Sequence, residues 1–210
     1  MTPSQLRTVA DALGAEIRRL IPDSLLASTD GYYRAKLASF PFDALELAIA
    51  GYVSEHYSVG TAVLEAGAGI GQLSLLLTTL GFQTLPIECD PHRHGLTRSL
   101  VESLHAAAYC KPVLGLFPGV IAEERLEYDV LVTTNVINTW WKTWSATLEE
   151  KLTACLRGKD AILDIERLGE HRPTEEGQMS AVSVICGLGY EAEKLETGVT
   201  SAIYAFRRKA

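Results

Sequence analysis

Three alternating glycines follow a short apolar segment that ends in an acid. Residues 63–71 have the sequence V-L-E-A-G-A-G-I-G, which predicts a strand that turns through Gly67, Gly69 and Gly71 into a helix. Glycine has no Cβ, so the backbone N–H groups of such a turn can approach a ligand closely. In an open α/β sheet the turn lies at the carboxyl end of the first strand, where such folds bind nucleotides.

The spacing of these glycines separates two classes of cofactor site. The dinucleotide fingerprint is Gly-x-Gly-x-x-Gly, with an acid about 20 residues later. Here the third glycine comes one residue early, and Gln72 stands where that fingerprint has glycine. Glu65 at the strand end completes the pattern acid-x-Gly-x-Gly-x-Gly. This pattern resembles the first motif of the class I S-adenosylmethionine-dependent methyltransferases.

The resemblance implies that the glycine turn binds S-adenosyl-L-methionine. In that family the turn wraps around the methionine and ribose portions of the cofactor, and the acid organises the loop or the cofactor's amino group. The positions that match are Glu65, Gly67, Ala68, Gly69 and Gly71. A tight turn without a ligand is the alternative, and the entropy that each glycine loses on folding disfavours it.

A second acid lies where the first motif requires one. Gln83–Glu88 predicts the next strand, and Glu88 follows Glu65 by 23 residues. A carboxylate at that strand end can accept hydrogen bonds from both ribose hydroxyls. The stretch around it resembles the family's second motif. Asp90 is the alternative, but Asp90-Pro91 is typical of a helix N-cap and first helical residue.

Three further cofactor contacts are expected at less regular positions. After the third strand the family usually supplies a polar residue to the adenine amino group, but residues 114–118 are L-G-L-F-P. Phe117 is predicted to stack on adenine instead, which leaves the polar contact unassigned. Tyr33 is expected to meet the methionine carboxylate, with ordinary amphipathic packing as an equal alternative. Asn135, just after the fourth strand, completes the predicted cofactor set.

All three tryptophans lie in the segment T-W-W-K-T-W after the predicted fourth strand, as Trp140, Trp141 and Trp144. That position borders the ligand crevice of an open α/β sheet. In methyltransferases that resemble this chain, the same loop faces the transferring methyl group. We expect Trp140 and Trp141 to bind the acceptor, as apolar walls or by cation–π attraction to an amine. Burial against the core or in a subunit interface is the alternative.

Methyl transfer from a sulfonium is an in-line displacement, so positioning can supply much of the acceleration. An oxygen or protonated nitrogen acceptor also needs a general base within about 3 Å. Asn138, Glu166 and His171 are the predicted catalytic residues, and Asp164 is a further candidate. A lone histidine in a loop is more often a surface residue, which is the alternative for His171.

The elements that position these residues follow the hydrophobic periodicity. An N-terminal helix is predicted from Leu6 to Leu20, ending at Pro22, and Pro41 is predicted to open a second helix. The predicted strands are 62–65, 83–88, 112–116, 128–133, 161–165, 190–196 and 201–207. The predicted helices between them are 72–80, 91–107, 145–156 and 175–186.

This pattern predicts a Rossmann-like, doubly wound α/β fold with a mostly parallel seven-stranded sheet. The last strand is expected to be antiparallel, as in the methyltransferases that the chain resembles. Residues 59–210 are predicted to form the S-adenosylmethionine-binding domain. Residues 1–58 are predicted to form a helical segment that packs on the same domain and covers the cofactor or selects the acceptor.

Composition restricts the partners. The 210 residues are 47% hydrophobic and 21% charged, which fits one compact domain. The net charge of −7 argues against nucleic acid or an anionic membrane as partner. No C-x-x-C pair, targeting signal or membrane-spanning run occurs, and His92 and His94 do not share a helix face. We therefore expect a cytoplasmic protein without a metal site.

The sequence thus predicts a methyltransferase that acts on oxygen or nitrogen of a small-molecule acceptor. A noncatalytic cofactor-binding subunit and a protein methyltransferase are alternatives. A nicotinamide-dependent oxidoreductase is disfavoured by Gln72, and a nucleic-acid methyltransferase by the charge and by the absence of Asn-Pro-Pro-aromatic after strand four. A homodimer is left open.

Overall fold

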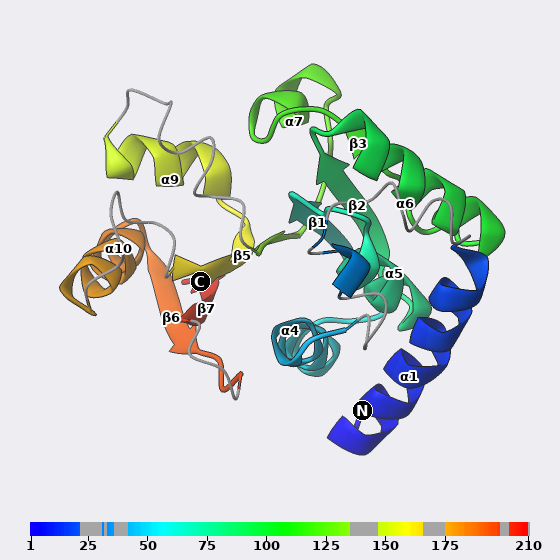
Figure 1. Ribbon diagram of the computed structural model, residues 1–210. Helices are drawn as coiled ribbons and strands as arrows, with labels where there is room; N and C mark the ends of the chain where they lie inside the picture. Colours follow the sequence, from blue (N-terminus) through cyan, green and yellow to red (C-terminus); the bar gives the residue numbers. More distant parts are fainter. Residues whose placement is uncertain are drawn as a thin grey trace.

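The computed structural model describes residues 1–21, 31, 33–35, 42–134, 147–165, 175–197 and 202–209. Within these ranges the chain forms one seven-stranded sheet with helices on both faces (Figure 1). The strands are β1 (Ala62–Ala66), β2 (Gln83–Glu88), β3 (Val113–Leu114), β4 (Val130–Thr133), β5 (Asp160–Asp164), β6 (Tyr190–Lys194) and β7 (Ile203–Arg208). The helices are α1 (Pro3–Leu20), α4 (Ala44–His56), α5 (Gln72–Thr79), α6 (Pro91–Ser103), α7 (Gly119–Glu123), α9 (Leu148–Leu156) and α10 (Glu175–Gly187).

The strand order is β3-β2-β1-β4-β5-β7-β6. Strands β1 to β5 run parallel to one another, whereas β7 pairs antiparallel with both β5 and β6. The predicted fold class, including the antiparallel last strand, is therefore confirmed. The order of strands reverses between β1 and β4, and open α/β sheets bind ligands at the carboxyl ends of the strands beside such a reversal.

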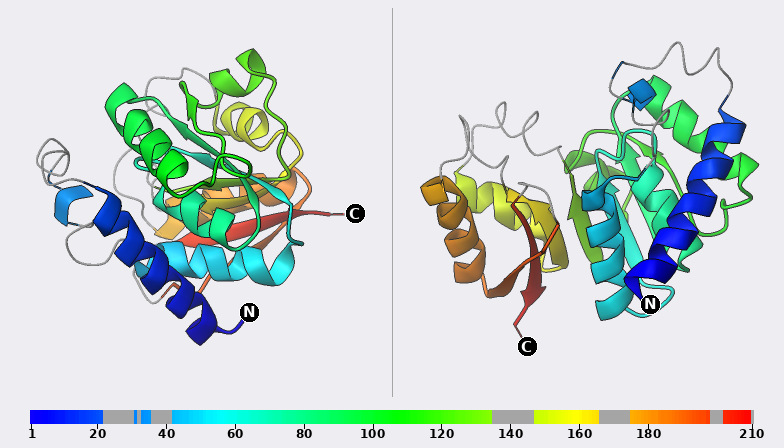
Figure 2. Two further views of the ribbon diagram at one scale, coloured as in Figure 1. Left: turned by 90° about the vertical axis from the view of Figure 1, so that its right-hand side faces the viewer. Right: turned by 60° about the horizontal axis from the view of Figure 1, so that its bottom comes forward.

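Side chains alternate between the two faces of the sheet and fill two hydrophobic clusters. On β4, Val130 and Val132 belong to the first cluster and Leu131 to the second. Residues of α1, α4, α5 and α6 complete the first cluster, and residues of α7, α9 and α10 complete the second. Figures 1 and 2 show the two groups of helices on opposite sides of the sheet. Burial on both faces explains why the central strands are almost wholly apolar.

Helix α4 begins later than the sequence suggested. Pro41 was expected to open it, but the helix starts at Ala44 with Asp43 as its N-cap. Asp43 accepts a hydrogen bond from the Glu46 N–H at 2.9 Å, and Glu46 accepts one from the Asp43 N–H at 3.0 Å. This reciprocal capping box satisfies two backbone donors that a helix end otherwise leaves unpaired. The D-x-x-E pattern was the signal that fixes the boundary.

The other differences are one additional helix and shifts of element ends. Helix α6 ends at Ser103 rather than at residue 107, β3 contains only two residues, and α7 was not predicted. Helix α9 starts at Leu148 because Thr147 and Glu150 form a second capping box. In the described part of the chain, no helix combines the length and apolar character that crossing a bilayer requires.

Candidate functional site

The carboxyl ends of the five parallel strands meet at one edge of the sheet. Ala66 at the end of β1 is in register with Thr133 at the end of β4. On the other flank Glu88, which ends β2, is in register with Leu114 of β3. Asp164 ends β5 and is buried. A polar or charged side chain therefore ends three of these strands at the edge where the glycine turn begins.

The glycine turn has the conformation that its sequence requires. Gly67, Gly69 and Gly71 have φ angles of 69°, 60° and 75°, in the left-handed region that residues with a Cβ rarely adopt. Two backbone hydrogen bonds hold the turn. The Ala68 N–H donates to the carbonyl of Ile87 on β2, and the Gly71 N–H donates to the carbonyl of Ala68. The predicted strand–turn–helix unit is present.

Glu65 organises the start of helix α5. Its buried carboxylate accepts hydrogen bonds from the backbone N–H of Ser74 at 3.0 Å and from the Ser74 hydroxyl at 2.6 Å. Gly71 is the N-cap of this helix and has no side chain to cap it, so the acid from β1 takes that role. This geometry matches one of the two functions expected of Glu65; contact with a cofactor amino group stays a prediction.

Glu88 is bonded directly to the glycine turn. Its side chain is 5% exposed, and Oε2 accepts a hydrogen bond from the Gly69 N–H at 2.9 Å. Oε1 accepts the Asp90 N–H at 2.8 Å and a weak contact from the Cys89 thiol at 3.6 Å. Because each carboxylate oxygen has two acceptor positions, Oε2 keeps one for a ligand hydroxyl.

This arrangement differs from the expectation that the turn presents its N–H groups to a ligand. The N–H groups of Ala68, Gly69 and Gly71 all donate within the protein. What Gly69 offers a ligand is therefore its lack of a Cβ, and the acceptor is supplied by Glu88.

Asp90 caps helix α6, as the sequence predicted. Its Oδ1 accepts the Arg93 N–H at 2.8 Å, and Pro91 is the first helical residue. The same backbone hydrogen bond lowers the pKa of Asp90 from its usual value. The carboxylate of Asp90 is thus engaged at the helix end, and Glu88 is the acid that contacts the turn.

Tyr33 lies against the glycine turn. A Cβ on Gly69 would overlap the Tyr33 hydroxyl and would lie 2.6 Å from Cζ and 2.9 Å from Cε1 of the same ring. The guanidinium of Arg93, on α6, is 5.8 Å from the centre of the Tyr33 ring. The sequence did not predict this contact with the turn, and the predicted contact of Tyr33 with a methionine carboxylate stays a prediction.

Phe117 does not occupy the position that was predicted for it. Its side chain is only 4% exposed and packs in the second cluster with Ile87 and Val120. A ring buried in this way has little surface to stack on adenine, so that prediction is not supported. The exposed apolar side chains near the end of β3 are instead Leu114 and Leu116, at 48% and 64%.

Thr133 is a site residue that the sequence did not single out. It is buried at the end of β4 beside Ala66, and its Oγ1 has no hydrogen-bond partner among the described residues. A buried hydroxyl without a partner is costly, so its place at the ligand-binding edge suggests that a ligand or water satisfies it. Its place at the end of a central strand was the only signal in the sequence.

Several predicted residues lie outside the part of the chain that the structure describes. They are Asn135, Asn138, Trp140, Trp141, Trp144, Glu166 and His171. Their predicted contacts with cofactor and acceptor therefore stay predictions.

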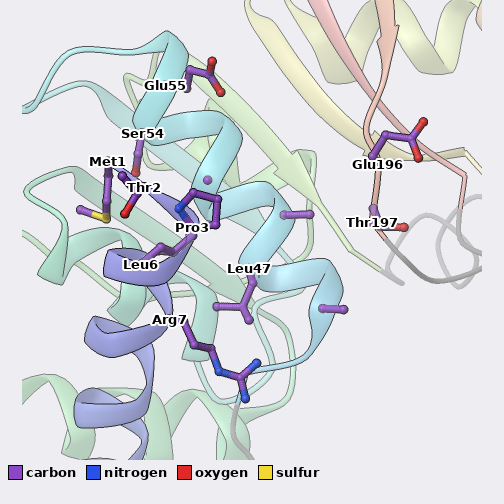
Figure 3. Close-up of a pocket in the computed structure, with 13 residues that line it drawn as sticks. Met1, Thr2, Pro3, Leu6, Arg7, Leu47, Ser54, Glu55, Glu196 and Thr197 are labelled. Atoms are coloured by element: carbon purple, nitrogen blue, oxygen red, sulfur yellow. The ribbon is translucent and has the colours of Figure 1, made fainter.

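A separate pocket of about 530 Å³ lies along helix α4. Figure 3 shows side chains from the start of α1 and from α4 on one side of it and Glu196 and Thr197 on the other. Its described lining includes no residue of the glycine turn and not Glu88. This pocket is therefore distinct from the carboxyl edge of the sheet.

Comparison with known proteins places the fold. No protein-family model matches the chain, and no curated protein matches it. The structure of monomeric WbdD, a bifunctional kinase-methyltransferase, matches at a TM-score of 0.65 with 16% identity. That match covers 88% of this chain and 48% of WbdD, so the chain spans about half of that protein.

Two other similar structures are matched over most of their own length. A TehB-like SAM-dependent methyltransferase from Corynebacterium glutamicum matches at a TM-score of 0.56 and 16% identity, over 90% of this chain and 100% of that one. Precorrin-6y C5,15-methyltransferase from Geobacter metallireducens matches at 0.55 and 14%, over 78% and 88%. Identities this low show the fold alone. The chain therefore has the fold of the class I S-adenosylmethionine-dependent methyltransferases.

Proposed function

We propose that the protein binds S-adenosyl-L-methionine and transfers its methyl group to an acceptor. The observation that carries this proposal is the hydrogen bond between the glycine turn and Glu88. Three left-handed glycines that follow β1 and the buried carboxylate that ends β2 meet at the carboxyl edge of the sheet, beside the point where the strand order reverses. A ribose hydroxyl is a donor that fits this acceptor, and Glu88 is held by two backbone N–H groups in the position to receive it.

The described residues fit such a cofactor at several points. Glu88 would accept a hydrogen bond from the ribose. The Oγ1 of Thr133, which has no hydrogen-bond partner among the described residues, would bond a polar group of the ligand. Leu114 and Leu116 would replace Phe117 as the apolar surface against adenine. When bound, the cofactor supplies a methyl group on a positively charged sulfur. The chain's own part is to fix the orientation of the reactants and to exclude water.

The acceptor side of the proposal is carried by the sequence. Trp140 and Trp141 would form its walls, and Asn138, Glu166 or His171 would act on the proton of an oxygen or nitrogen acceptor. Among the described residues, Asp164 is the carboxylate at the end of β5, beside this region. A small-molecule acceptor agrees with the net charge of −7, which would repel nucleic acid.

Calorimetric titration tests the cofactor. We expect S-adenosylhomocysteine to bind the intact chain with one site, and NAD under the same conditions to give no heat. Methyl transfer from radiolabelled S-adenosylmethionine is then measured with small amines, phenols and carboxylates, a protein mixture and nucleic acid. Binding without transfer to any of them would favour a noncatalytic cofactor-binding subunit. Binding of NAD in place of S-adenosylhomocysteine would overturn the proposal.

A further inference from the structure

The space that Gly69 leaves open is occupied by the protein itself. A Cβ at this position would overlap the hydroxyl of Tyr33, which therefore stands where a ligand would come closest to the turn. Tyr33 comes from a segment far from the turn in sequence, so this contact belongs to the tertiary structure. A cofactor that approaches the Gly69 backbone must displace the Tyr33 hydroxyl.

Arg93 lies between Tyr33 and Glu88, the carboxylate that is bonded to the glycine turn. Its guanidinium is 5.8 Å from the centre of the Tyr33 ring, and its Nε is 4.0 Å from Oε1 of Glu88. Burial opposes the charge on Arg93, but the Glu88 carboxylate and the Tyr33 hydroxyl outweigh it and raise the pKa of the guanidinium. The charged side chain of Arg93 thus lies near both the Glu88 carboxylate and the ring of Tyr33, which covers Gly69.

We propose that Arg93 is a positioning residue that holds Tyr33 over Gly69, in competition with the cofactor for the same space. This inference rests on the proposed function, because the competing ligand is S-adenosylmethionine. It is the alternative to the predicted contact of Tyr33 with the methionine carboxylate, under which Tyr33→Ala would bind the cofactor more weakly. The guanidinium lies 5.8 Å from the ring centre and also interacts with the Tyr33 hydroxyl, so removing its charge should loosen the hold on the ring. Only the molecules in which Tyr33 has moved away can bind the cofactor. The apparent dissociation constant therefore equals the intrinsic one divided by the fraction of such molecules.

The experiment is a double-mutant cycle read by S-adenosylhomocysteine calorimetry and stopped-flow association. Arg93→Met keeps a side chain of similar length and removes the charge, and Tyr33→Ala removes the ring. We expect each variant to bind about two- to fivefold more tightly than the original chain, with the gain in the association rate. Adding Arg93→Met to Tyr33→Ala should change nothing further, because Arg93 acts through Tyr33.

Arg98→Met is the matched control. Arg98 lies five residues further along α6 and pairs with Glu102 at 3.6 Å, so its loss should leave affinity and association unchanged. A readout without ligand is the NMR signal of ¹³C-labelled tyrosine, assigned to Tyr33 by its loss in Tyr33→Phe. That signal should shift in Arg93→Met and stay in place in Arg98→Met.

The outcomes separate this inference from the proposed function. Failure of both the original chain and Tyr33→Ala to bind would remove the cofactor proposal. If both bind with equal affinity, or if Tyr33→Ala binds more weakly, Tyr33 does not compete and the inference is wrong. An effect of Arg93→Met that persists in the Tyr33→Ala background would show that Arg93 acts through Glu88 instead, which also overturns it.

Discussion

Glu88 connects ligand recognition to folding at the scale of single residues. The sequence predicted that Glu88 accepts hydrogen bonds from the ribose of the cofactor. In the structure the same carboxylate holds the N–H groups of Gly69 and Asp90, so the turn and the start of α6 both depend on it. A substitution of Glu88 should therefore affect both ligand binding and local stability.

Glu88→Ala should therefore have two effects. Loss of two backbone hydrogen bonds to a buried charge should lower the free energy of unfolding by about 1–3 kcal/mol. Affinity for S-adenosylhomocysteine should fall as well, and both changes are measured by urea denaturation and calorimetry. Glu102→Ala, at an exposed position of α6, is the control and should change neither. Normal affinity in Glu88→Ala would remove it from the ribose role.

Gly69→Val should be more damaging than an ordinary glycine substitution. A β-branched residue is strained at a φ of 60°, and its Cβ would overlap the Tyr33 hydroxyl. We expect a lower melting temperature and no detectable binding of S-adenosylhomocysteine. Gly95→Ala in α6, where a Cβ meets nothing within 4 Å, should instead stabilise the protein by about 0.5–1 kcal/mol. Equal behaviour of the two variants would show that the turn tolerates a side chain.

At the scale of elements, the second cluster contains a buried phenol. Tyr128, next to β4, is 3% exposed, and burial raises its pKa to about 12. In the unfolded chain the same group ionises near a pKa of about 10. The neutral phenol is therefore favoured by folding: its contribution is complete below about pH 10 and is lost as the pH rises toward 12.

Tyr128→Phe removes this titration while keeping the ring. Its hydroxyl makes only a long contact of 3.5 Å to the carbonyl of Cys155, so the cost at pH 8 should be small. Between pH 8 and pH 11 the original chain should lose about 1–2 kcal/mol more than the variant. Urea denaturation at the two pH values measures the difference. Parallel losses in both proteins would mean that Tyr128 does not titrate as its burial requires.

Local patterns predicted the elements well and the contacts between them poorly. Strand β2 was predicted with the observed bounds, and the start of α5 was fixed by the glycine turn. Phe117 is buried in one cluster with Val120 and Ile121 of α7 and Ile87 of β2, and no local pattern in the sequence shows this packing. The contact between Tyr33 and Gly69 likewise joins segments far apart in sequence. Positions in the chain predict which strand end a residue occupies, but not what covers it.

At the scale of the whole molecule, the N-terminal helices are part of the main hydrophobic core. Leu13 of α1 and Ile49 of α4 lie in the same cluster as Val63 of β1 and Leu76 of α5. A hydrogen bond also connects this region to β5, because the hydroxyl of Tyr57, which follows α4, donates to Asp160 at 3.0 Å. Helices α1 and α4 of the segment 1–58, which the sequence assigned to covering the cofactor or selecting the acceptor, therefore cover one face of the sheet.

Residues 59–210 alone should consequently fail to fold cooperatively. The buried side chains of α1 and α4 in the first cluster include Leu6, Leu13, Ile17, Ile49 and Val53. Each contributes about 1.5–3 kcal/mol, which together approaches the whole stability of a typical domain of about 5–15 kcal/mol. Ile49→Ala in the full chain should cost about 2–5 kcal/mol, whereas the exposed control Glu55→Ala on the same helix should cost almost nothing. Circular dichroism during urea denaturation measures all three. If the fragment instead unfolds in one sharp transition and binds S-adenosylhomocysteine, the N-terminal segment is a separable cover, and its place in the core contributes little to holding the sheet together.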